Sequence, residues 1–121
     1  MTITTETKGQ SKVAVIHSDE ILISNVQDAL DVMMTARHET ECDKIILRKE
    51  NIIEDFFDLS TKLAGEVLQK YVNYYLVAAI VGDFSAYTSK SLRDFIYECN
   101  KGRHVFFMPD EAAALEKLHS L

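Results

Sequence analysis

Residues 45–82 read IILRKENIIEDFFDLSTKLAGEVLQKYVNYYLVAAIVG, and this stretch decides the fold. It begins with the apolar run at residues 45–47 and ends with a second apolar run at 76–81. An acidic loop and a long amphipathic segment lie between the two runs. Uninterrupted aliphatic runs are typical of strands that are covered on both faces. The stretch therefore predicts one strand-helix-strand unit of an α/β protein.

The helix of this unit is predicted where apolar side chains recur every three or four positions. Asp58 and Ser60 are both suitable N-cap residues, and the sequence leaves the choice between them open. Gly65 lies in the helix interior, where glycine costs about 1 kcal/mol relative to alanine, so we expect another backbone to approach it closely. The apolar stripe consists of Leu63, Ala64, Val67, Leu68, Tyr71, Val72 and Tyr75.

The flanking segments predict further strands and helices. Residues 3–7 and 12–17 are expected to pair as an antiparallel hairpin. Gly102 is expected to end a helix in the left-handed conformation. The other predicted elements are a helix at residues 21–37 with Ser24 or Asn25 near its start, a strand at 44–48, a helix from Thr88 or Ser89 to about residue 100, a strand at 104–108, and a helix from Pro109-Asp110 onward.

The predicted order is β-β-α-β-α-β-α-β-α. It indicates an α/β fold in which an N-terminal hairpin leads into a mostly parallel sheet with about four helices. The 121 residues, of which 47% are hydrophobic, fit a single domain over residues 1–121.

The net charge and the lengths of the apolar runs argue against two classes of function, nucleic-acid binding and membrane association. The net charge of −6 argues against a nucleic-acid partner, because the phosphate backbone would be repelled. The longest apolar run, at residues 74–81, is far shorter than the roughly 20 residues of a membrane-spanning helix, so no membrane association is predicted. The N-terminal segment lacks the features of a secretory signal. We therefore expect a cytoplasmic location.

Common chemical motifs are absent from the sequence. Cys42 and Cys99 have no metal-binding or redox spacing and are expected to be reduced thiols. The four histidines are scattered, so no metal site is predicted. No glycine-rich nucleotide motif or hydrolase motif occurs. We predict no catalytic residue and no cofactor, and a non-enzymatic role is favoured.

Polar residues follow several predicted strands, and His17, Arg48 and Asp83 are candidates for a binding site there. Open parallel sheets bind ligands beyond the carboxyl ends of their strands. A small-molecule-binding protein or a small enzyme is therefore the alternative function. A receiver-like phospho-aspartate site is disfavoured, because no lysine follows the last predicted strand.

The segment Phe56-Phe57-Asp58-Leu59-Ser60-Thr61, together with the element order, resembles the STAS domain of anti-sigma-factor antagonists. More closely, three segments resemble the bacterial domain of unknown function 4180 family, a likeness that spans nearly the whole chain. These segments are EDFFDLSTKLAGEVLQ, VGDFSAYTSKSLRDFIYE and LISNVQDALD. That family brings no established activity.

The STAS resemblance implies a regulatory module in which a kinase phosphorylates a serine at a helix N-terminus and so changes partner binding. By this resemblance Ser60 would be the phosphorylated residue, Thr61 the second candidate, and Asp58 the acid of the motif. The chain departs from the motif at Leu59, which stands where the motif has a serine, and at Lys62. A protein partner is therefore expected, and a homo-oligomer is left open.

Overall fold

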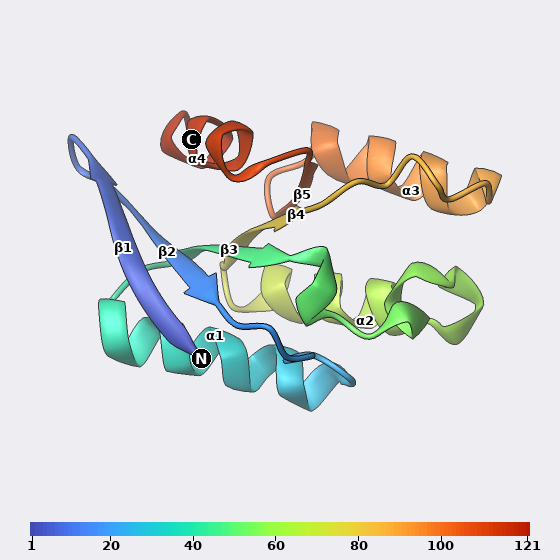
Figure 1. Cartoon of the computed structure of the whole chain (residues 1–121), viewed down its shortest axis with the longest axis horizontal. Coiled ribbons are helices and arrows are strands. Elements are labelled where there is room, and N and C mark those ends of the chain that lie inside the picture. The colour runs from blue at the N-terminus through green and yellow to red at the C-terminus, as the bar shows by residue number, and fades with distance from the viewer.

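The computed structural model describes all 121 residues and shows strands alternating with helices (Figure 1). Three short 3-10 turns lie between β3 and α2, at Lys49–Asn51, Glu54–Phe57 and Leu59–Thr61. The strands and helices are β1 (Thr2–Lys8), β2 (Ser11–His17), α1 (Val26–Thr40), β3 (Lys44–Arg48), α2 (Leu63–Asn73), β4 (Val77–Val81), α3 (Lys90–Lys101), β5 (Val105–Met108) and α4 (Glu111–His119).

The five strands form one sheet in the order β1-β2-β3-β4-β5. β1 pairs antiparallel with β2, and the other three pairs are parallel. Gly9 forms the hairpin turn at a φ of +60°, a conformation that glycine adopts without a steric penalty. The predicted α/β class is confirmed, with its N-terminal hairpin, mostly parallel sheet and four helices.

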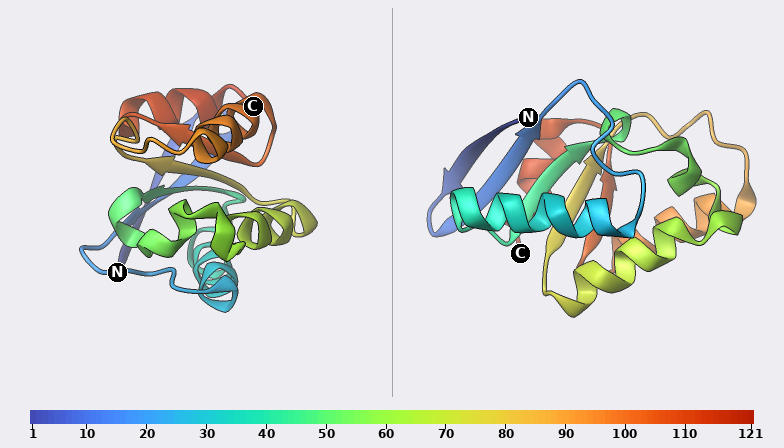
Figure 2. Two further views of the ribbon diagram at one scale, coloured as in Figure 1. Left: turned by 90° about the vertical axis from the view of Figure 1, so that its right-hand side faces the viewer. Right: turned by 90° about the horizontal axis from the view of Figure 1, so that it is seen from below.

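Helices α1 and α2 lie on one side of the sheet and α4 lies on the other (Figures 1 and 2). Each face of the sheet carries its own apolar core. The larger core includes Ala14 and Ile16 of β2 and is covered by α1 and α2, while α3 adds Leu92 to it. The smaller core takes Val13 and Val15 from the same strand and is covered by α4. Successive side chains of a strand point to opposite faces, so this division explains the continuous apolar runs in the sequence.

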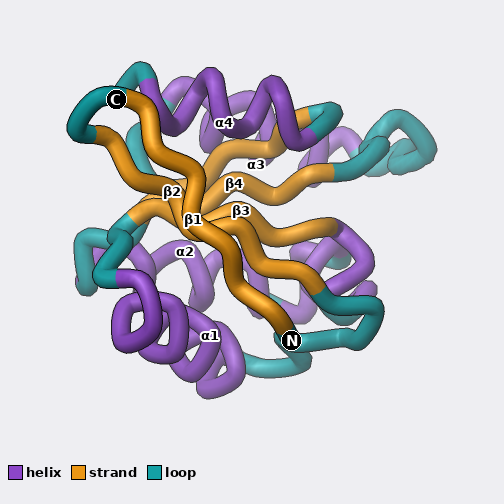
Figure 3. Tube along the Cα trace, turned by 60° about the vertical axis from the view of Figure 1, so that its left-hand side comes forward, coloured by secondary structure: helices purple, strands orange, loops and turns teal.

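Polar contacts anchor the end of α4 beside the hairpin, and Figure 3 shows the C-terminal end of the chain there. His119 Nδ1 lies 2.7 Å from Ser11 Oγ. Lys44 Nζ donates to the Leu118 carbonyl at 2.9 Å and to Ser11 Oγ at 3.1 Å.

On the other face of the sheet, the buried Tyr71 hydroxyl donates to the Ala29 carbonyl at 2.9 Å, and this bond links α2 to α1. Burial raises the pKa of Tyr71.

The first helix begins later than its apolar spacing predicted. Residues 21–24 precede α1, whose first residue is Val26, and Asn25 Oδ1 caps it by accepting from the Asp28 N–H at 2.8 Å. The start predicted at residue 21 was wrong because Ile23 pairs with another segment. It forms an isolated parallel bridge with Ile52, and its carbonyl accepts from Ile53 N at 2.9 Å.

Two expectations at helix ends were also wrong. Tyr75 was placed on the apolar stripe of the central helix, but it follows the end of α2, has a φ of 58° and is 81% exposed. Gly102 closes α3 with an extended conformation, at a φ of −86°, and its N–H donates to the Cys99 carbonyl at 2.9 Å. No helix combines the length and the apolar character that crossing a lipid bilayer requires.

Candidate functional site

Asn51, in the turn that follows β3, and Tyr71 of α2 are the two buried residues whose side chains carry oxygen or nitrogen. Asn51 Oδ1 accepts from the Arg48 backbone N–H at 3.1 Å. Its Nδ2 donates to the carbonyls of Ser18 at 2.9 Å and Glu20 at 3.0 Å. Because the buried side chain of Asn51 is paired with these backbone groups, the loop between β2 and α1 is fixed to the end of β3. Sequence reasoning missed Asn51, which belongs to no motif.

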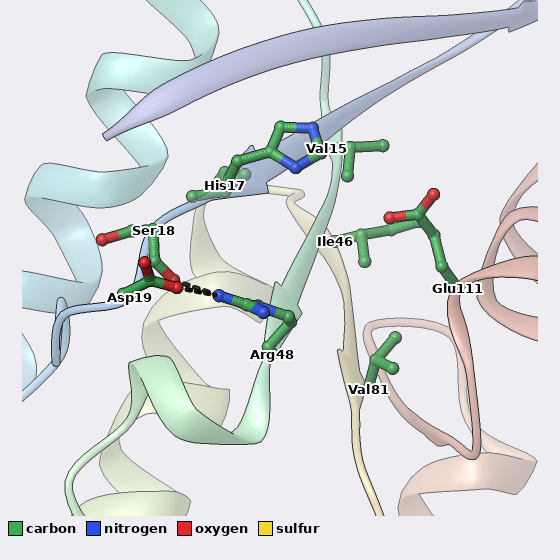
Figure 4. Close-up of a pocket in the computed structure, with 9 residues that line it drawn as sticks. Val15, His17, Ser18, Asp19, Ile46, Arg48, Val81 and Glu111 are labelled. Atoms are coloured by element: carbon green, nitrogen blue, oxygen red, sulfur yellow. Dashed lines mark hydrogen bonds and ion pairs between the residues drawn. The ribbon is translucent and has the colours of Figure 1, made fainter.

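A pocket of about 450 Å³ opens at the carboxyl ends of β2, β3 and β4, on the α4 face of the sheet (Figure 4). Its floor is apolar. Figure 4 shows Glu111, from the first turn of α4, on one side of this floor and Arg48 on the other. The structure thus brings together His17 and Arg48, two of the three predicted strand-end residues. The lining side chains are Val15, Ile46 and Val81 of the floor, with His17, Ser18, Asp19, Arg48 and Glu111 around it.

The polar groups of this pocket are only partly engaged by the protein. Arg48 Nη2 donates to the Ser18 carbonyl and lies 3.4 Å from Asp19 Oδ1, whereas its Nε and Nη1 have no protein partner. His17 Nε2 lies 2.8 Å from Thr4 Oγ1 of β1. The Glu111 carboxylate makes no hydrogen bond or ion pair. A cationic group and an anionic group therefore remain available on two sides of an apolar floor.

Asp83, the third predicted strand-end residue, lies outside this pocket. It borders a separate hollow of about 440 Å³ with Phe84, Phe107, Met108 and their neighbours. Asp83 Oδ1 accepts from the Ser85 N–H at 2.9 Å, and hydrogen bonding from Ser85 lowers the pKa of Asp83. Its carboxylate therefore organises its own loop and does not join Arg48.

Asp58, Ser60 and Thr61 lie together in an exposed turn before α2. Ser60 donates to Asp58 Oδ1 twice, from Oγ at 2.6 Å and from the backbone N–H at 3.0 Å. These two bonds lower the pKa of Asp58. Thr61 Oγ1 instead contacts the carbonyls of Asp55 at 2.7 Å and Asp58 at 2.8 Å.

The expectation that Asp58 or Ser60 caps the central helix was wrong. Lys62 occupies the N-cap of α2, in the left-handed conformation at a φ of 68°, and makes no side-chain capping bond. Asp58 caps the separate 3-10 turn Leu59–Thr61. This turn and the reversal at Lys62 separate Ser60 from the first turn of α2.

A shallow hollow of about 440 Å³ lies beside this turn, where α2 faces Phe95 of α3. Gly65 is exposed in it, and no heavy atom of a neighbouring segment lies within 4 Å of the position that a Cβ would take. The predicted close approach of another backbone is therefore wrong within this chain. The hollow is lined by Leu59, Lys62, Gly65, Glu66, Gln69 and Phe95.

Aromatic packing anchors the segment just before the Ser60 turn. The rings of Phe57 and Tyr87 are stacked with centroids 5.2 Å apart, and Lys49 Nζ lies 5.1 Å from the Tyr87 centroid. The Tyr87 hydroxyl donates to Glu54 Oε1 at 2.6 Å, and burial together with Glu54 raises the pKa of Tyr87. The 3-10 turn Glu54–Phe57 is thereby fixed to the loop between β4 and α3.

The remaining titratable groups form no further chemical site. No group of three or more histidine, cysteine, aspartate or glutamate side chains is placed to hold a metal ion. Cys42 and Cys99 are free and buried. Burial and Glu98 raise the pKa of Cys99 to about 11. That thiol is therefore protonated at neutral pH and is not an activated nucleophile.

Comparison with known proteins identifies a family and a distant structural likeness. Residues 8–118 match the family model described as Domain of unknown function (DUF4180), which confirms the resemblance seen in the sequence. No curated protein matches the chain. A solved structure from Thermotoga maritima, provisionally described as an anti-sigma factor antagonist, aligns over 97% of this chain and 94% of its own at 13% identity, with a TM-score of 0.47. That likeness concerns the overall arrangement alone.

Proposed function

This chain belongs to the DUF4180 family, whose description names no activity, and we propose that it is a regulatory protein-interaction module. The proposed contact surface is the hollow beside the turn at residues 58–61. Ser60 is proposed as the residue whose phosphorylation changes that surface. The observation that carries the proposal is the exposed Gly65 in the first turn of α2.

Gly65 is the third residue of α2, so it lies in the first turn and not in the helix interior that the sequence predicted. Glycine still forms a helix less readily than alanine, at a cost of up to about 1 kcal/mol. Nothing within this chain compensates for that cost at Gly65, because no heavy atom of a neighbouring segment lies within 4 Å of the position that its Cβ would take. A glycine leaves room for the backbone of another molecule to approach α2. The half-buried Leu59 and Phe95 supply apolar contact there, and Lys62 and Glu66 supply a polar rim.

Ser60 is suited to control this surface because its exposed hydroxyl bonds to Asp58 alone. Phosphorylation would remove the donated proton and bring a charge of about −1.5 to −2 beside the Asp58 carboxylate. Asp58 also accepts the Ser60 N–H, so repulsion between the two groups would open the 3-10 turn. Opening this turn would displace Leu59 and Lys62, which both line the hollow. Thr61 is less suited, because its hydroxyl contacts two loop carbonyls.

The test is affinity capture from the native cell with a tagged chain, followed by mass spectrometry of the recovered proteins. Wild type is compared with Ser60→Ala, Ser60→Asp and Gly65→Gln. The control is Lys70→Gln, which changes an exposed residue of α2 outside the hollow. Phosphate on Ser60 and Thr61 is measured in the protein isolated from the same cells.

The proposal expects one partner that wild type and Lys70→Gln recover equally and that Gly65→Gln loses. It also expects Ser60→Asp to alter recovery of that partner while the melting temperature stays nearly unchanged. Equal recovery by all five proteins, with no phosphate on Ser60 or Thr61, would contradict both the surface and the switch.

A further inference from the structure

The pocket at the carboxyl ends of β2, β3 and β4 shares no residue with the hollow beside Ser60. We propose that this pocket binds a small zwitterion with the chemistry of a free, apolar amino acid. The ligand carboxylate would pair with Arg48, its ammonium group with Glu111, and its side chain would rest on the apolar floor. This inference is independent of the proposed protein-interaction surface.

Arg48 retains the donors that a carboxylate requires. Its contacts to Ser18 and Asp19 both use Nη2, so Nε and Nη1 each keep a free N–H that can donate to a carboxylate. The backbone N–H of Arg48 is held by Asn51, which also holds the Ser18 carbonyl. The guanidinium therefore starts from a fixed frame, which lowers the ordering cost of binding.

Glu111 provides the matching anion on the other side of the floor. It is the first residue of α4, where the positive end of the helix dipole stabilises a carboxylate. Asp110 already caps this helix by accepting from the Ala113 N–H at 2.8 Å, so Glu111 is not needed for capping. Its carboxylate has no partner in the chain, and Figure 4 shows it directed over Ile46.

The floor and the volume fit a compact apolar side chain. Val15 and Ile46 are each 2% exposed, and the partly exposed Val81 completes the floor. A volume of about 450 Å³ lies within the usual range of small-molecule sites. An anion without an ammonium group would leave Glu111 facing a second negative charge, and a simple cation would meet Arg48. A zwitterion satisfies both groups.

The test titrates the ¹⁵N-labelled chain with L-alanine, L-valine and L-leucine at up to about 10 mM, which detects millimolar Kd values. N-acetyl-L-valine, which lacks the ammonium group, and L-valinamide, which lacks the carboxylate, serve as matched probes. The amide signals of Val15, Ile46 and Val81 report binding. The variants are Arg48→Gln and Glu111→Gln, with Glu116→Gln as a control on an exposed part of α4 outside the pocket.

We expect at least one amino acid to bind and both blocked probes to bind at least tenfold more weakly. Glu111→Gln should remove the preference for valine over N-acetyl-valine, and Arg48→Gln should remove the preference for valine over valinamide. Glu111→Gln breaks no bond within the chain, so its result holds even if Arg48→Gln loosens the loop. No signal change with any of the three amino acids would overturn the proposal, as would equal binding of the blocked probes.

Discussion

Two of the three 3-10 turns between β3 and α2, Lys49–Asn51 and Leu59–Thr61, differ in where their polar groups find partners. The turn Lys49–Asn51 buries Asn51, whose side chain bonds to residues of a distant loop. The turn Leu59–Thr61 is largely exposed, and its side-chain bonds stay within residues 55–63. The long-range hydrogen bonds of the buried Asn51 side chain make the first turn a rigid support for the strand-end pocket. Local, exposed bonds leave the second turn free to change without disturbing the fold.

The largest expected effect comes from Asn51→Ala, which tests the first half of this comparison. The change leaves the Arg48 N–H and the Glu20 carbonyl without their partner and removes one of two donors to Ser18. Each hydrogen bond lost in this partly buried network costs about 0.5–1.5 kcal/mol, so we expect a loss of about 3 kcal/mol in the free energy of unfolding. Urea denaturation measures this loss.

Glu50→Ala is the matched control, because Glu50 lies in the same turn but is exposed. It should change stability by less than about 0.5 kcal/mol. In Asn51→Ala, amide exchange should also accelerate at Leu22 and Ile23, whose N–H groups donate to the Asn51 carbonyl. Equal losses from both substitutions would show that the turn itself, and not the buried side chain, holds the loop.

The sequence was informative where burial follows a repeating pattern. The runs that became β3, β4 and β5 are continuous and apolar because each strand faces a core on both sides. The helical pattern gave a wrong helix start at residues 21–24. The spacing of apolar residues there continues the spacing in α1, but the backbone forms hydrogen bonds with residues 51–53 instead. These are backbone bonds to a distant segment, and they leave no periodic signal in the sequence.

The second prediction compares two glycines whose surroundings are opposite. A Cβ at Gly82 would lie 2.7 Å from Lys49 Cβ, whereas a Cβ at Gly65 would meet nothing within 4 Å. Gly82→Ala should therefore destabilise the fold by about 1–3 kcal/mol through overpacking. Gly65→Ala, in the first turn of α2, should stabilise it by up to about 1 kcal/mol through higher helix propensity.

Thermal melts of the two variants beside wild type provide the measurement. Gly82 lies against the first of the two compared turns, because Lys49 is in the same 3-10 turn as Asn51. Gly65 lies beside the second, exposed turn. A destabilised Gly65→Ala would mean that another segment does approach α2, and it would remove the main support for a partner surface there.

The candidate pocket could be anticipated from the sequence only in part. His17 and Arg48 are the last residues of neighbouring parallel strands and were candidates for a binding site there, and both line the pocket. Glu111 was not found because it belongs to a helix start and not to a strand end. The signal lay in the topology: the helices that connect β2 to β5 cover one face, so the last helix is left to cover the other. Its first turn then reaches the strand ends of that face.

The smallest expected effect is that of Ser60→Ala, which tests the exposed turn Leu59–Thr61. Because Ser60 caps no α-helix, the substitution should change the free energy of unfolding by less than about 0.5 kcal/mol. The lost Oγ bond should, however, raise the pKa of Asp58 back toward its ordinary value of 3.8. The pKa of this carboxyl is lowered in the folded state, so its stabilising contribution is present above about pH 3.8 and is lost as the pH falls through the lower folded-state value. The difference in stability between wild type and Ser60→Ala should shrink over the same pH range.

Carboxyl ¹³C titration of Asp58 in wild type, Ser60→Ala and Ser60→Thr measures the pKa of this carboxyl, and the threonine variant is expected to keep the lowered pKa. An unchanged Asp58 pKa in Ser60→Ala would show that the hydroxyl does not hold this turn, and phosphorylation would then have no bond there to break.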